Sequence, residues 1–157
     1  MTKLIAVFIF YDKSAGAQSI LSFSKEFRHC NTVVFDGSDW IAIEFDRAGF
    51  IVRRVKVHDS ERFLAKLQLI KEVTAIVSVV IVKRKNVCWM PWWVRSCNQV
   101  SRYASGIDIG ITFNPIHFYR KLIKYNARTN YQILTHWRRS DGHRVRRYDA
   151  GSSARSN

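Results

Sequence analysis

The chain has 157 residues, of which 47% are hydrophobic and 13% aromatic, a composition that supports one domain with a buried core and excludes a disordered protein. No apolar run approaches the roughly 18 residues that cross a bilayer, and the first apolar segment lacks a signal-peptide cleavage site. We therefore expect no transmembrane segment and synthesis in the cytoplasm. The formal net charge of +14 favours contact with nucleic acid, anionic lipid, an acidic protein surface or an anionic cell-wall polymer.

The first part of the chain predicts mainly β-strands. A short apolar run near the N-terminus is typical of a buried strand, and a helix is expected over residues 15–27. A turn at Asp36-Gly37-Ser38-Asp39 then predicts a hairpin, because Gly37 suits the first central position of a type II′ turn. The strands expected here cover residues 3–11, 28–35, 40–45 and 50–57.

The later part of the chain predicts helices with clear start signals. Asp59 or Ser60 caps one helix, and Asn114 caps another whose first residue is Pro115. An apolar strand is expected at the centre of the sheet, and a last hairpin turns near residues 140–142. The later strands expected cover residues 74–83, 131–138 and 144–148. The fold class is therefore α+β, with a single basic domain over residues 1–150 and a flexible tail over residues 151–157.

Three cysteines form neither an even disulfide framework nor a C-x-x-C pair, so free thiols are expected and no metal or cofactor is predicted. They are Cys30, Cys88 and Cys97. Ser96 and Gln99 have the spacing of a capping box, which makes Cys97 the first residue of a helix that ends at Gly106. Backbone N–H groups and the helix dipole at that place would lower the pKa of a thiol from about 8.5. Cys97 is therefore the candidate nucleophile.

A thiol nucleophile needs a base, and His29 is the candidate because it begins a predicted strand. If the hairpin turns between Gly37 and Ser38, His29 lies opposite Asp46 and diagonal to Glu44, so that both acids share its face of the sheet. A carboxylate there would orient the imidazole. Glu44 is the first choice for this role and Asp46 the second, and a shift of one residue would move both acids to the other face.

This order of residues resembles the circularly permuted papain-like cysteine hydrolases, which include lecithin:retinol acyltransferase-type enzymes and permuted relatives of NlpC cell-wall peptidases. The similarity covers roughly residues 28–122: a histidine opening an early strand, the helix that begins at Ser96-Cys97-Asn98-Gln99-Val100, and a helix started by Asn114-Pro115. It implies an antiparallel sheet packed against the nucleophile-bearing helix. It also implies cleavage of an amide or ester bond in peptidoglycan or an acyl substrate. The family tends to place its polar orienter where this chain has Ile41. Small phage-encoded proteins share this design, which implies a place in a virion.

Simpler roles compete with each assignment. The alternatives are a Cys97 packed in the core, a His29 that binds only backbone, and a Glu44 paired with Arg53 or Arg54. The alternative function is a catalytically inactive phage virion, tail or assembly protein. Its basic segment, residues 128–157, has seven arginines and no lysine and would dock on acidic virion proteins or DNA. Three tryptophans at residues 89, 92 and 93, next to Lys83-Arg84-Lys85, would suit single-stranded nucleic acid or simply wedge a helix onto the sheet.

Overall fold

The computed structural model describes residues 4–12, 27–46, 49–56, 59–83, 96–125, 130–141 and 146–147. Several sequence predictions lie outside these residues: all but the last residue of the helix over residues 15–27, the tryptophans at residues 89–93, and the tail over residues 151–157. The third cysteine, Cys88, also lies outside them.

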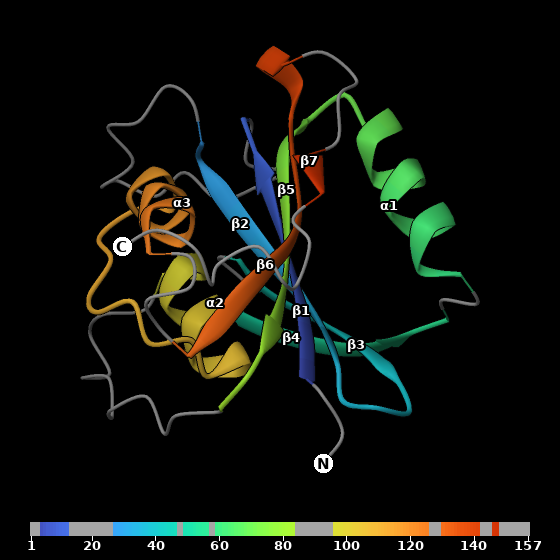
Figure 1. Ribbon diagram of the computed structural model, residues 1–157, viewed down its shortest axis with the longest axis horizontal. Helices are drawn as coiled ribbons and strands as arrows, with labels where there is room; N and C mark the ends of the chain where they lie inside the picture. The colour runs from blue at the N-terminus through green and yellow to red at the C-terminus, as the bar shows by residue number, and fades with distance from the viewer. Residues whose placement is uncertain are drawn as a thin grey trace, which may run out of the picture.

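One antiparallel sheet organises the described part of the chain (Figure 1). Its seven strands have the order β4-β3-β2-β1-β5-β6-β7. The strands are β1 Leu4–Tyr11, β2 His29–Phe35, β3 Trp40–Asp46, β4 Gly49–Val55, β5 Val73–Ile81, β6 Tyr131–Arg138 and β7 Arg146–Arg147. The α+β class expected from the sequence is confirmed, and the apolar strand β5 is interior, between β1 and β6.

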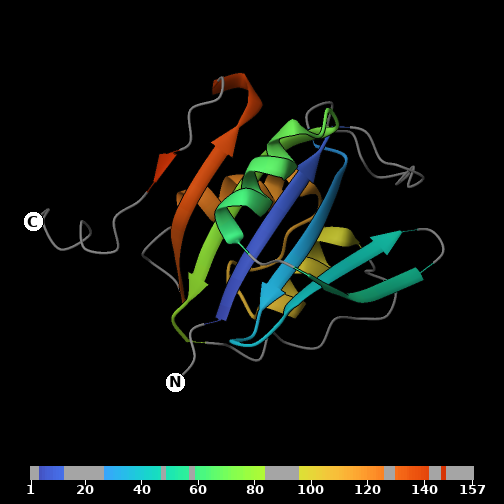
Figure 2. The ribbon, with the colours of Figure 1, turned by 90° about the vertical axis from the view of Figure 1, so that its right-hand side faces the viewer.

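Helices cover both faces of the sheet. Figure 2 shows α1 (Ser60–Leu69) on one face, with α2 (Cys97–Ser105) and α3 (Pro115–Lys124) behind the other. Because strand residues alternate between faces, Phe8 and Phe10 pack with Phe118 of α3, whereas Val7 and Ile9 belong to the cluster that contains Leu67 of α1. Each face of the sheet therefore has its own apolar core.

The predicted helix ends are confirmed. The Asp59 side chain accepts hydrogen bonds from the backbone N–H groups of Glu61 and Arg62, and the Asn114 side chain accepts one from His117. Gly106 ends α2 with φ of 69°, in the left-handed region that favours glycine. These ends are fixed by bonds within a few residues of the chain, which is why the sequence predicts them.

The hairpin register is also as predicted. Thr32 pairs with Ile43 and Phe35 with Trp40, which is the register obtained when the chain turns between Gly37 and Ser38. Gly37 has φ of 109°, a value that an L side chain rarely adopts.

The basic C-terminal segment contributes an interior strand to the sheet. β6 pairs with β5 on one side and with β7 on the other. The last predicted hairpin is thus present, although its second strand covers just Arg146–Arg147. Tyr131 and Ile133 of β6 are fully buried, so the described residues 131–138 of this segment are part of the domain core.

Asn130 joins three separate parts of this fold. Its side-chain amide donates to the carbonyl oxygens of Lys83 and Gly106, both at 2.7 Å, and its side-chain oxygen accepts from the backbone N–H of Asp108 at 2.9 Å. The side chain is nearly buried, with 7% of its surface exposed. Asn130 therefore fixes the start of β6 to the end of β5 and to the chain that follows α2.

Candidate functional site

Cys97 is the first residue of α2, as the sequence predicts, but the capping box does not form. The Ser96 hydroxyl is buried and has no hydrogen-bond partner among the described residues. The Gln99 side chain instead donates to the carbonyl of Thr112 at 2.6 Å, and Asn98 donates to the same residue. The capping-box prediction is wrong because a loop 13 residues further along the chain takes the glutamine amide.

The thiols lie where α2 packs on β2. The Cys97 side chain packs against the core cluster on this face, which contains Cys30, and the Cys30 sulfur is 3.6 Å from the hydroxyl of Ser101, one turn along α2. Burial raises the pKa of the Cys97 thiol. Hydrogen bonds from backbone N–H groups, of which that of Cys30 has the largest effect, lower the pKa by a smaller amount. Burial also raises the pKa of Cys30 well above its usual value, with a contribution from Cys97. The predicted lowering of the Cys97 pKa is therefore wrong: desolvation outweighs the helix terminus.

His29 belongs to the other face of the sheet. It pairs with Tyr11 of β1, and the two rings have centroids 6.0 Å apart. Consecutive residues of a strand point to opposite faces, so His29 shares the α1 face with Asn31, whereas Cys30 faces α2. The predicted thiol and its predicted base are thus not brought together on one face.

The predicted orienter Glu44 has another partner. Its carboxylate forms an ion pair with Arg53 of β4 at 2.5 Å, which is the simpler of the two roles expected for it. Asp46 ends β3 opposite Gly49, and its side chain lies outside the described part of the structure.

A polar chain that was not predicted surrounds His29. The Nε2 atom of His29 lies 2.6 Å from the side-chain oxygen of Asn31, and the Asn31 side chain also hydrogen-bonds to the Tyr11 hydroxyl. Burial raises the pKa of Tyr11 to about 12, although the hydrogen bond to Asn31 lowers it by a smaller amount. The signal available in the sequence was the spacing of two residues between His29 and Asn31, which places both on one face of a strand. This chain of groups can bind a polar ligand or relay a proton, but no described cysteine lies on its face.

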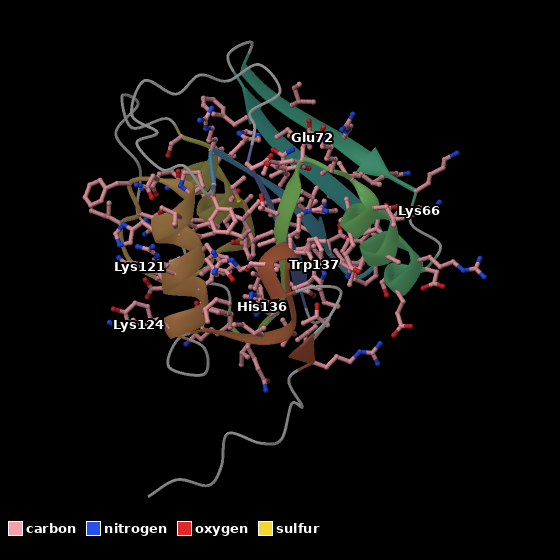
Figure 3. All side chains as sticks on the ribbon, turned by 90° about the horizontal axis from the view of Figure 1, so that it is seen from above. Lys66, Glu72, Lys121, Lys124, His136 and Trp137 are labelled. Carbon is pink, nitrogen blue, oxygen red and sulfur yellow. The ribbon has the colours of Figure 1, made fainter. Side chains whose placement is uncertain are left out.

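A different histidine lies on the same face as Cys97. His136 of β6 is buried, and its Nε2 atom is 2.6 Å from the hydroxyl of Tyr119. Figure 3 shows His136 on the α3 side of β6 and Trp137 on the opposite side, toward α1. Cys97 lies where α2 packs on β2, and three strand spacings, about 14 Å at the usual distance between strands, separate β2 from the strand of His136.

A basic surface with exposed apolar side chains lies at the start of α3. We call it the Phe113 surface, and it consists of Ile111, Phe113, His117, Arg120 and Lys121. Phe113 is 76% exposed and Ile111 62% exposed. The Phe113 and His117 rings stack at 14° with centroids 5.9 Å apart, and the Lys121 ammonium donates to the carbonyl of Ile111 at 2.8 Å.

Comparison of the chain with protein-family models, with curated proteins and with solved structures finds no match. The papain-like resemblance therefore rests on the sequence motifs alone. None of the described helices is both long and apolar enough to span a bilayer.

Proposed function

We propose that this protein is a catalytically inactive docking protein that binds a single-stranded nucleic acid through the Phe113 surface. The observation that carries the proposal is the placement of the predicted catalytic pair: the Cys97 thiol packs on the α2 face of β2, and the His29 imidazole belongs to the α1 face. A pKa raised by burial and a base on the other face of the sheet both count against the cysteine–histidine mechanism.

The charge distribution supports a polyanionic partner. Residues 73–140 contain eleven lysines and arginines and a single acid, Asp108. The described residues of this segment, which include β5, α2, α3 and β6, carry seven of these basic side chains and the single acid. Figure 3 shows Lys121 and Lys124 along α3, on the side of the molecule opposite α1.

The exposed rings favour single-stranded nucleic acid over an acidic protein. Bases stack on aromatic side chains whatever their sequence, and basic groups nearby bind the phosphates. Phe113 offers an exposed ring that stacks on His117, and the charges of Lys121 and Arg120 act on that imidazole. Burial, followed by Lys121 and Arg120, lowers the pKa of His117, which favours the uncharged imidazole.

The arginines of the C-terminal segment are less suited to docking, because those described bind within the fold. Arg139 donates to the carbonyls of Ile70 and Val73, and Arg147 forms an ion pair with Glu61. Arg138 lies over the rings of Phe27 and Tyr119, 5.8 Å from each centroid. The proposed docking surface therefore moves from residues 128–157 to α3. With the sequence resemblance, a phage virion or assembly role remains part of the proposal.

The test is binding of a fluorescent oligothymidine to the full chain, followed by anisotropy at several salt concentrations. Phe113→Ala should weaken binding roughly tenfold or more through the lost stacking, and Arg120→Gln should weaken it and reduce the salt dependence by about one phosphate contact. Lys66→Gln, on α1, is the matched control and should bind like the parent protein. Equal affinity of all four proteins, or an equal loss in the control, would contradict the proposal.

The hydrolase predicted from the sequence is the competing function and has its own test. An activated acyl probe should leave Cys97 unlabelled, and iodoacetamide should react with it more slowly than with free cysteine, because its pKa is raised. Acyl labelling that disappears in Cys97→Ser would instead establish a reactive thiol and overturn the inactive assignment.

A further inference from the structure

We propose that Cys97 and Cys30 form an oxidation site, at which a small peroxide joins α2 to β2 through a disulfide bond. They are the two cysteines of the described part of the chain, and both are free thiols. Cys97 is the first residue of α2 and Cys30 belongs to β2. The packing of the helix on the sheet therefore brings together two thiols that are far apart in the sequence.

Two contacts place the thiols next to each other. The Cys30 sulfur is 3.6 Å from the hydroxyl of Ser101, and residues four apart in a helix, such as Cys97 and Ser101, are neighbours on one face with Cβ atoms about 5–6 Å apart. The backbone N–H of Cys30 also donates a hydrogen bond to the Cys97 sulfur. That sulfur is therefore within a few ångströms of the Cys30 side chain. A disulfide, whose Cβ atoms are about 3.8 Å apart, requires a small movement of the first turn of α2.

The two thiols differ in exposure, and this difference sets the order of the reaction. Cys97 is half-buried, whereas Cys30 is 1% exposed. A peroxide from solvent therefore reaches Cys97 first, and Cys30 is the thiol that resolves the oxidised product. Burial raises the pKa of both thiols, so the reaction is slower than that of a free cysteine.

The reaction has two steps, with hydrogen peroxide as the oxidant. The Cys97 thiolate attacks one peroxide oxygen, the O–O bond breaks, and the hydroxide that leaves takes a proton to form water. The Cys30 thiolate then attacks the sulfur of the Cys97 sulfenic acid, the S–O bond breaks, and a second hydroxide leaves and is protonated to water. The protons gained by the two hydroxides equal those lost by the two thiols. Two thiols are thus oxidised to one disulfide, and one peroxide is reduced to two water molecules.

The disulfide would hold the start of α2 on the sheet. Asn98 and Gln99 directly follow Cys97 and donate to the carbonyl of Thr112, so the constraint extends to the segment before α3. A cross-link between residues far apart in the sequence stabilises a fold, more so for a longer loop. In a reducing cytoplasm the pair would stay as thiols. The fold would therefore be more stable in oxidising surroundings than in reducing ones.

The experiment treats the folded full chain with hydrogen peroxide, blocks the remaining thiols with N-ethylmaleimide and maps the peptides by mass spectrometry without reduction. We expect a peptide pair joined through Cys30 and Cys97. We also expect a thermal midpoint roughly 5–15 °C above that of the reduced protein, and dithiothreitol should reverse both changes.

Two matched variants test the order of the steps. Cys30→Ser keeps a side chain of similar size but removes the resolving thiol, so Cys97 should persist as a sulfenic acid that reacts with dimedone, and the midpoint should not rise. In Cys97→Ser, Cys30 should resist dimedone because it is buried. The reverse labelling would overturn the assigned order.

The unmodified chain decides the site itself. A disulfide mapped to Cys88, or a Cys97 that stays a thiol or a sulfenic acid after peroxide treatment, would overturn the proposal. A disulfide between Cys30 and Cys97 with no higher midpoint would overturn its stabilising role. None of these outcomes depends on the oligonucleotide assay.

Discussion

Replacement of Asn130 by alanine should be among the most damaging single polar substitutions in this protein. The change removes three side-chain hydrogen bonds to backbone groups of Lys83, Gly106 and Asp108, with lengths of 2.7–2.9 Å, at a position that is 7% exposed. A hydrogen bond of this kind contributes about 1 kcal/mol net, and more where its partner is left buried and unpaired. We therefore expect the free energy of unfolding to fall by about 3 kcal/mol.

Urea unfolding followed by circular dichroism measures this loss, and Asn114→Ala provides the comparison. That variant removes one capping bond, to His117, and should cost about 1 kcal/mol. Asn130→Asp adds a test of direction. The carboxylate of this variant can accept from the Asp108 N–H but cannot donate to the two carbonyls. The loss in free energy of unfolding relative to the parent protein should therefore be smaller at acid pH, where the protonated carboxyl group donates one hydrogen bond. A loss in Asn130→Ala no larger than that in Asn114→Ala would refute the reasoning.

Helix ends and one tyrosine should give further measurable effects. Asp59→Ala should lower the free energy of unfolding by about 1 kcal/mol because the side chain caps α1. Ser96→Ala should change it by less than about 0.5 kcal/mol because the Ser96 hydroxyl forms no cap. Equal losses of the two variants in urea unfolding would contradict this prediction. Gly106→Ala should cost about 1 kcal/mol, since its φ is 69°, and an unchanged urea midpoint would be the contrary result. The Tyr11 pKa is about 12 in the folded chain against a usual 10.0, so the unfolded chain ionises first and stability should fall by up to about 2 kcal/mol from pH 10 to pH 12. Tyr11→Phe should lack this part of the decrease, and a parallel pH profile for both proteins would show that the pKa is not raised.

Local signals in the sequence determined the helix ends and the hairpin register. Asp59, Asn114 and Gly106 act through bonds to residues within one helical turn, so their roles can be predicted without the rest of the fold. The register of β2 and β3 follows from the turn and from the alternation of apolar residues, both of which are also local.

The tertiary structure alone decided which residues share a site. Both faces of β2 are apolar enough to pack against helices, so the sequence could not establish that α2 covers the face of Cys30 and leaves His29 on the face of α1. It also could not show that Gln99 binds Thr112 in place of the capping position, or that Arg139 binds the carbonyls of Ile70 and Val73. These contacts join residues far apart in the chain, and they depend on how the helices and strands pack. A helix start determines where a thiol lies along the chain, but the packing around Cys97 determines its pKa and its distance from a base.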